Sequence, residues 1–169
     1  MGLSPAAAFD KIAATYDEQF SGSLVGQAQR AIVWEEMDRV FAPRHRILEI
    51  NCGTGVDAIH MARRAVEVFA YDASPAMVSV AQSRVGRESL QDRVRLGVLP
   101  NEDLARIEGE SLFDGLLSDF GGLNCVENLL ALAQHVARLL KPNAPALVCV
   151  FGRFCVWELL WYLGQLNLR

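Results

Sequence analysis

The chain has 169 residues, of which 51% are apolar and 21% are charged, and its formal net charge is -4. A chain of this length and apolar content is the usual size of a single domain with a buried core. The small negative charge gives no reason to expect a nucleic acid as partner. The sequence therefore predicts one domain without a polyanionic partner.

Cysteine usage and terminal signals bear on location and metal binding. The cysteines are Cys52, Cys125, Cys149 and Cys155. They show neither CxxC spacing nor a histidine at metal-ligand distance, so neither a metal site nor a disulfide framework is expected, and a reducing compartment fits best. No basic stretch precedes an apolar core at the N-terminus, and the longest apolar stretch, 154–166, is too short to span a bilayer. We expect a cytoplasmic protein without a membrane span.

Two helices are expected before any strand. The first runs from Ser4-Pro5 to about residue 20 and the second over about 24–41, because apolar residues recur there at helical spacing. After Pro43, short apolar runs alternate with helical segments. The expected strands are 46–50, 66–71, 94–98, 113–118 and 146–151, and the expected helices are 56–64, 75–85, 101–107 and 126–140. This alternation predicts a doubly wound parallel α/β sheet with helices on both faces.

An apolar strand runs into a glycine turn and then a helix at residues 47–58, ILEINCGTGVDA. Gly53 and Gly55 let the backbone come close to a ligand where a side chain would collide. The spacing of these two glycines and Ala58 also satisfies the dinucleotide fingerprint, with Asp72 as the expected ribose acid. The spacing alone therefore does not decide between a dinucleotide and another nucleoside cofactor.

Acidic residues near this turn favour S-adenosylmethionine over a dinucleotide. A dinucleotide presents a pyrophosphate, which binds best at a helix N-terminus free of negative charge. Here Glu49 and Asp57 lie close to the turn and would repel a dianion, whereas S-adenosylmethionine brings an ammonium, a sulfonium and no phosphate. An NAD-dependent oxidoreductase remains the alternative.

At these residues the sequence resembles a known family. Residues 48–55, LEINCGTG, resemble the acidic-x-glycine-x-glycine motif of class I S-adenosylmethionine-dependent methyltransferases. Asn51 stands where that family usually has glycine, and asparagine tolerates left-handed backbone angles better than most residues. Residues 71–77, YDASPAM, resemble the family's acidic strand end and Ser-Pro helix start, and 113–118 and 139–143 resemble later parts of its sheet. The resemblance implies a Rossmann-like methyltransferase fold.

The opening residues 9–17, FDKIAATYD, resemble the N-terminal helix of the family's small-molecule branch, which contains the quinone-biosynthesis methyltransferases. In that branch the helix folds over the cofactor as a lid. The implied organisation is one domain over 1–169, with a helical lid over 1–42 and a cofactor-binding α/β core over 43–169.

The resemblance also implies site residues. Asp72 would accept hydrogen bonds from both ribose hydroxyls, and Glu49 would polarise the loop that holds the methionine ammonium. The implied cofactor-binding residues are Glu49, Asn51, Cys52, Gly53, Gly55, Asp72, Ala73, Met77, Asn101, Glu102 and Ser118. Tyr16 and Asp119 are the candidate catalytic residues if the acceptor is a hydroxyl or carbon acid that needs a base. No metal is implied.

The implied function is methyl transfer from S-adenosylmethionine to a small-molecule acceptor. The family's sheet usually ends in two further strands, so this chain is expected to be short at its C-terminus, and a non-catalytic S-adenosylmethionine-binding module is a further alternative. Residues 155–163 are apolar nearly all round a helix, which needs burial on more than one side, and the fifth strand is expected to be an open edge. We therefore expect either self-association as a homo-oligomer or a further portion of chain that covers these surfaces.

Overall fold

The computed structural model describes residues 5–107, 112–152, 156 and 163. Five strands form one sheet in the order β3-β2-β1-β4-β5, and all neighbouring pairs are parallel. The strands are β1 (Arg46–Ile50), β2 (Glu67–Asp72), β3 (Val94–Val98), β4 (Gly115–Ser118) and β5 (Ala146–Val148). The expected parallel sheet is confirmed, and β1 lies at its centre.

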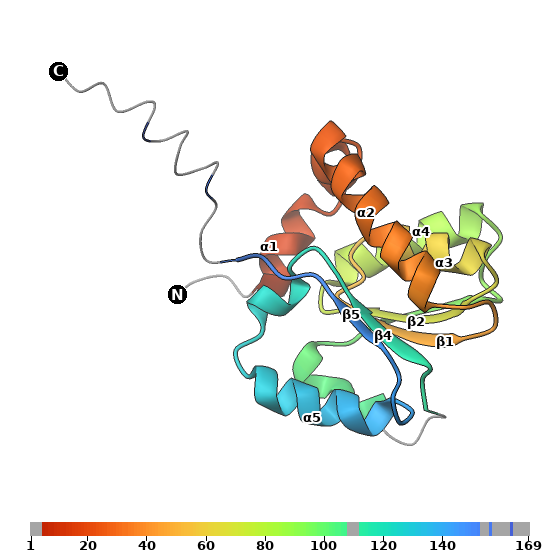
Figure 1. Ribbon diagram of the computed structural model, residues 1–169. Helices are drawn as coiled ribbons and strands as arrows, with labels where there is room; N and C mark the ends of the chain where they lie inside the picture. The colour runs from red at the N-terminus through yellow and green to blue at the C-terminus, as the bar shows by residue number, and fades with distance from the viewer. Residues whose placement is uncertain (1–4, 108–111, 153–155, 157–162, 164–169) are drawn as a thin grey trace.

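Helices cover both faces of the sheet. Figure 1 shows three of them on one face, α2 (Leu24–Val40), α3 (Val56–Arg63) and α4 (Pro75–Arg87), and α5 (Leu129–Leu139) on the other. The 3-10 helix η2 (Asn101–Ile107) packs against α5, and α1 (Pro5–Ile12) packs against α4. This is the doubly wound arrangement that the alternating sequence pattern predicts.

Each face of the sheet has its own hydrophobic core, because successive side chains of a strand point to opposite faces. Ile47 packs with Met37 of α2 and Met61 of α3 on one face. Leu48 packs with Leu132 of α5 on the other. Burial of a side chain of this size contributes roughly 1.5–3 kcal/mol. The two cores fix the direction of β1 and therefore the position of the loop that follows it.

The N-terminal segment is not one continuous helix. α1 ends at Ile12, and a separate π-helical turn, η1, covers Asp17–Ser21. Asp17 accepts a hydrogen bond from Thr54 Oγ1 over 2.7 Å and pairs with Arg84. These tertiary contacts hold the turn against the core, and the prediction of one helix up to residue 20 was wrong.

Two later boundaries also differ from the expected ones. The expected helix over 126–140 begins only at Leu129, because Asn128 caps it by accepting a hydrogen bond from Ala131 N over 2.9 Å. A short 3-10 helix, η3 (Gly122–Cys125), lies before it. The last strand ends at Val148 rather than at residue 151, where the Asn124 side chain instead bonds the backbone of Phe151. In both places side-chain hydrogen bonds end the regular structure.

The surfaces expected to need a partner are described only in part. The expected helix over 155–163 lies almost entirely outside the described residues. Among the described strands β5 pairs with β4 alone, and Val148 at its end and Val150 just after it are exposed. Within the described part of the chain, none of the helices has the length and apolar character that crossing a membrane requires.

Candidate active site

A cavity of about 390 Å³ lies at the carboxyl ends of β1, β2 and β4. The chain order reverses at this point of the sheet, because β2 and β3 lie on one side of β1 while β4 and β5 lie on the other. Ligands of open parallel sheets bind in the crevice at such a switch point. The N-terminal segment contributes Ala6, Phe9 and Tyr16 to the wall of the cavity.

The loop after β1 forms one wall through left-handed backbone conformations. The φ angles of Asn51, Gly53 and Gly55 are 62°, 52° and 73°. A Cβ atom on Gly53 would have no atom within 4 Å, whereas one on Gly55 would lie 2.9 Å from the Ala81 side chain. Gly53 therefore leaves space in the cavity, and Gly55 allows α4 to pack closely. Asn51 is held in place because its Oδ1 accepts a hydrogen bond from Ser118 Oγ over 3.2 Å.

Asp72 ends β2 and joins this loop to the start of α4. Its two carboxylate oxygens accept hydrogen bonds from Gly53 N and Ser74 N, each over 2.8 Å. Burial raises the pKa of Asp72, and these amide hydrogen bonds oppose the shift. Ser74 caps α4 by accepting a hydrogen bond from Met77 N, with Pro75 following it, as expected for a Ser-Pro helix start. Asp72 is thus fixed at the wall of the cavity.

Three buried carboxyl groups gather at the other end of the cavity. Glu49, Asp57 and Asp119 are 1%, 4% and 7% exposed. Asp57 pairs with the buried Arg30 of α2 and accepts a hydrogen bond from Trp34 Nε1 over 2.6 Å. Burial opposes the charge of Arg30, yet the neighbouring Asp57 keeps the arginine's pKa above its usual range. One guanidinium therefore faces three acids.

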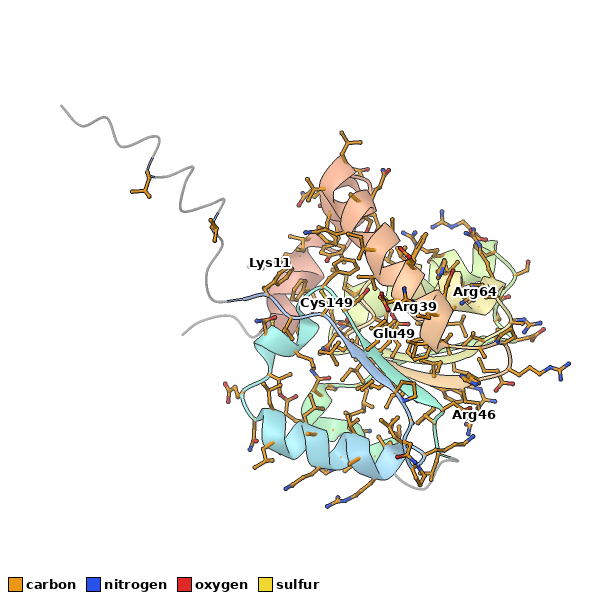
Figure 2. All side chains as sticks on the ribbon, viewed as in Figure 1. Lys11, Arg39, Arg46, Glu49, Arg64 and Cys149 are labelled. Atoms are coloured by element: carbon orange, nitrogen blue, oxygen red, sulfur yellow. The ribbon has the colours of Figure 1, made fainter. Side chains whose placement is uncertain are left out.

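Two of these acids lack a full set of hydrogen-bond partners. Both oxygens of Glu49 and Oδ2 of Asp119 have none among the described residues. Burial raises the pKa of each group well above its usual range, and the nearby charge of Asp57 adds to both shifts. Figure 2 shows Glu49 inside the molecule, between α2 and the sheet. Buried polar groups without partners are rare in folded proteins, so this end of the cavity is a candidate for ligand binding.

The N-terminal segment is fastened over the cavity by two aspartates. Asp10 accepts hydrogen bonds from Ser74 Oγ over 2.5 Å and from Ala76 N over 3.2 Å, and Asp17 bonds Thr54 and Arg84. Four aromatic rings contact one another in series, edge to face or tilted, from this segment to the loop after β4, in the order Phe9, Tyr16, Phe20 and Phe120. Burial raises the pKa of Tyr16, so its hydroxyl keeps its proton. The segment forms an aromatic side wall to the cavity.

The structure brings most of the residues named from the sequence to this one cavity. Those that line it are Tyr16, Asn51, Cys52, Gly53, Asp72, Ala73, Met77, Asn101, Glu102 and Asp119. Glu49, Gly55 and Ser118 are buried behind the lining. Sequence reasoning missed Arg30, which also lines the cavity, because nothing near it in the chain indicates a partner 27 residues away. Asp10 and Asp17 could have been named from the sequence, since both lie in residues 9–17, which resemble the family's N-terminal helix.

Comparison with known proteins agrees with this geometry. A ubiquinone/menaquinone biosynthesis C-methyltransferase from Geotalea daltonii is 30% identical over 127 residues, which are 72% of this chain and 53% of that protein. A tRNA 5-carboxymethoxyuridine methyltransferase from Escherichia coli is 31% identical over 57% of this chain and 39% of that protein. The chain thus spans about half or less of the length of these relatives.

A solved structure of DhpI with SAH shares the fold, with a TM-score of 0.69 and 24% identity over 88% of this chain and 69% of that one. A family model described as a methyltransferase domain matches residues 47–143. Because that match covers more than half of the chain, the protein belongs to the methyltransferase domain family, as its resemblance to class I S-adenosylmethionine-dependent methyltransferases predicted.

Proposed function

We propose that the protein transfers the methyl group of S-adenosylmethionine to a small-molecule acceptor bound against its N-terminal segment. The observation that carries this proposal is the cavity at the switch point, with an open glycine loop at one side and buried, partly unpaired carboxyl groups at one end. A ligand with positive charge at one end and a nucleoside at the other matches both features.

The residues present fit such a ligand. Asp72 lies beside Met77, Ala73, Asn101 and Glu102, which supports a ribose next to Asp72 and an adenine beyond it. The remaining lone pairs of the Asp72 oxygens are free to accept from hydroxyl groups, because a carboxylate offers about four acceptor positions. At Gly53 the empty space at the Cβ position allows close approach of a ligand.

The amino-acid end of the ligand fits the charged end of the cavity. The unpaired oxygens of Glu49 favour an ammonium at this end of the cavity, and the unpaired Oδ2 of Asp119 favours the positive sulfonium. Arg30 lines the same end, and its Nε has no hydrogen-bond partner among the described residues. A guanidinium with an unused donor suits a carboxylate. Arg30 is therefore our candidate for the methionine carboxylate, in addition to the residues that the sequence indicated.

When bound, S-adenosylmethionine supplies a methyl group on an already activated carbon. The protein then needs mainly to position the acceptor and exclude water. The aromatic rings of Phe9, Tyr16 and Phe120 provide an apolar surface against which the acceptor can be positioned. Where the acceptor must lose a proton, Asp119 is the better candidate base, since a carboxyl group with a raised pKa accepts a proton more readily, whereas Tyr16 keeps its own.

The small size of the acceptor is part of the proposal. The aromatic side wall and the negative net charge support an apolar small molecule over a polyanion. One relative is named for a tRNA substrate, so RNA belongs among the acceptors to be tested. A cytoplasmic location and self-association at the exposed β5 edge or the C-terminal residues also remain predictions.

Titration calorimetry with S-adenosylmethionine tests the proposal, and NAD is the matched comparison ligand because the glycine spacing also fits a dinucleotide. We expect saturable binding of S-adenosylmethionine and weaker or undetectable binding of NAD. Transfer of a labelled methyl group to candidate acceptors then separates an enzyme from a module that only binds the cofactor. Preferred binding of NAD would contradict the proposal.

A further inference from the structure

We propose that Asp119 gives up its proton when S-adenosylmethionine binds and keeps it when S-adenosylhomocysteine binds, so that the cavity favours the methyl donor over its product by charge. This inference rests on the proposed function. It concerns how one side chain at the end of β4 distinguishes two ligands that differ by a methyl group and one positive charge.

The first step is the position of Asp119. Its side chain lines the cavity directly after β4, is 7% exposed, and leaves Oδ2 without a hydrogen-bond partner among the described residues. Burial and the negative charge of the neighbouring Asp57 both raise the pKa of the Asp119 carboxyl group. A like charge close to a buried carboxyl group favours its protonated form. Because Asp57 already pairs with Arg30, Asp119 is the member of this pair that carries a proton in the empty cavity.

The second step is the charge around Asp119. Asp57 of α3, Glu49 of β1 and Arg30 of α2 act on it electrostatically, as does Tyr16 from the N-terminal segment. The charge of Asp119 also contributes to the raised pKa of the buried Cys52 thiol, after burial and the charges of Glu49 and Asp72. With Glu49 and Asp119 protonated, Tyr16 and Cys52 neutral, and Asp57 balancing Arg30, this cluster carries no net charge. The empty cavity thus avoids an unpaired buried charge, which would be costly.

The third step is the charge of the ligand. S-adenosylmethionine carries an ammonium, a sulfonium and a carboxylate, and so brings one net positive charge into the cavity. S-adenosylhomocysteine lacks the sulfonium and brings none. A positive charge placed near a buried carboxyl group favours its ionised form. Asp119 would therefore release its proton to the solvent with the donor only, and the resulting carboxylate would attract the sulfonium.

The test is titration calorimetry of the full chain with each ligand, in two buffers of different ionisation enthalpy, which gives the number of protons released on binding. We expect S-adenosylmethionine to release about one proton more than S-adenosylhomocysteine. We also expect the preference for S-adenosylmethionine to grow as the pH rises, since ionisation of Asp119 then becomes easier. Equal proton numbers with a pH-independent preference would overturn the inference while leaving the proposed function intact. If neither ligand binds, the proposed function itself fails.

Variants assign the proton to its residue. In Asp119→Asn the difference in proton number should vanish, and the preference for S-adenosylmethionine should fall by about tenfold. Asp92→Asn makes the same substitution in an exposed turn and should behave like the parent protein. In Glu49→Gln the difference in proton number between the two ligands should persist. A difference that disappears in Glu49→Gln and survives in Asp119→Asn would show that the assignment to Asp119 is wrong. The pH dependence in the parent protein decides the matter if Asp119→Asn does not fold.

Discussion

Two aspartates flank the same strand, β4, and differ in their hydrogen-bond partners and in the direction of their pKa shifts. Asp114 precedes the strand, where its oxygens accept hydrogen bonds from Arg46 N over 2.9 Å and from Lys141 Nζ over 2.5 Å. Burial alone would raise the pKa of Asp114, but its partners lower it below the usual range. Asp119 follows the strand, lacks a partner for Oδ2 among the described residues, and has a raised pKa.

The same contrast holds between the two ends of the sheet. At the amino end, Arg46 lies over the rings of Phe69 and Phe113, and the charged groups named there have partners. Figure 2 labels Arg46 at this end of the sheet. At the carboxyl end, the buried carboxyl groups of Asp57 and Asp119 line a cavity, and Oδ2 of Asp119 has no hydrogen-bond partner among the described residues. We infer that the paired charged groups at the amino end stabilise the fold. The unpaired buried carboxyl groups at the carboxyl end lower its stability, and a bound ligand would restore that stability. The following predictions test that division.

The largest effect is expected from Gly53→Val at the carboxyl end. The φ angle of 52° and the empty space at the Cβ position mean that the new side chain strains the loop and enters the cavity. Calorimetry should show no measurable binding of S-adenosylmethionine, while circular dichroism shows a folded chain. Gly86→Val in α4 is the matched control, since a Cβ there meets only the Gln91 side chain at 3.7 Å. Unchanged binding by folded Gly53→Val would mean that this loop does not hold the ligand.

Asp72→Ala should weaken binding of S-adenosylmethionine by roughly 10- to 100-fold. Hydrogen bonds to a charged acceptor contribute about 1.5–3 kcal/mol each. Asp72 also bonds two loop amides, so thermal unfolding must be measured alongside. Asp92→Ala serves as the control at an exposed position. A titration curve identical to that of the parent protein would exclude Asp72 as the ribose ligand.

The same substitution should affect stability at only one of the two aspartates that flank β4. Asp114→Asn is expected to lower the free energy of unfolding by about 1–2 kcal/mol at neutral pH, because it loses hydrogen bonds to a charged acceptor that is partly exposed. Asp119→Asn should change that energy by less than about 0.5 kcal/mol, since an amide has the shape of the protonated carboxyl group inferred above and, like it, can both donate and accept hydrogen bonds. Denaturant titration of both variants measures the difference. Equal losses would remove the distinction between the two ends.

A smaller and more gradual effect is expected with pH. Because the pKa of Glu49 is raised in the folded protein, the folded chain binds more protons than the unfolded chain above the ordinary carboxyl pKa of about 4. The contribution of this proton to the free energy of unfolding is complete below that pH and is lost as the pH rises through the raised pKa of Glu49. The free energy of unfolding of the ligand-free protein should therefore fall over this range, and Glu49→Gln should flatten the fall. A slope unchanged in Glu49→Gln would assign it to other groups.

Most of the fold could be predicted because strands and helices alternate strongly in this chain. The boundaries of β1 and β3 agree with the expected ones, since their apolar runs are bounded by clear turn residues. The break after Ile12 and the late start of α5 could not be predicted in the same way. They depend on hydrogen bonds formed by single side chains, such as those of Asp17 and Asn128.

The site was predictable where local sequence carries the geometry. Ser74 was predicted as a helix cap, and Asn51, which stands where the family usually has glycine, adopts the left-handed conformation that asparagine tolerates. The buried pair of Arg30 and Asp57 was not predictable, because it joins α2 to α3 across 27 residues and has no spacing signature. The lack of partners for Glu49 is likewise a property of the packed interior rather than of the sequence around it.

Nuclear magnetic resonance of backbone amides on addition of S-adenosylhomocysteine tests most directly whether the carboxyl end of the sheet is the binding site. The account predicts that the largest shifts occur in three loops at that end, 51–55, 72–77 and 119–122. Amides around Arg46 and Asp114 at the amino end should move little. Largest shifts at the amino end, or saturation without any shift in the three loops, would contradict the account.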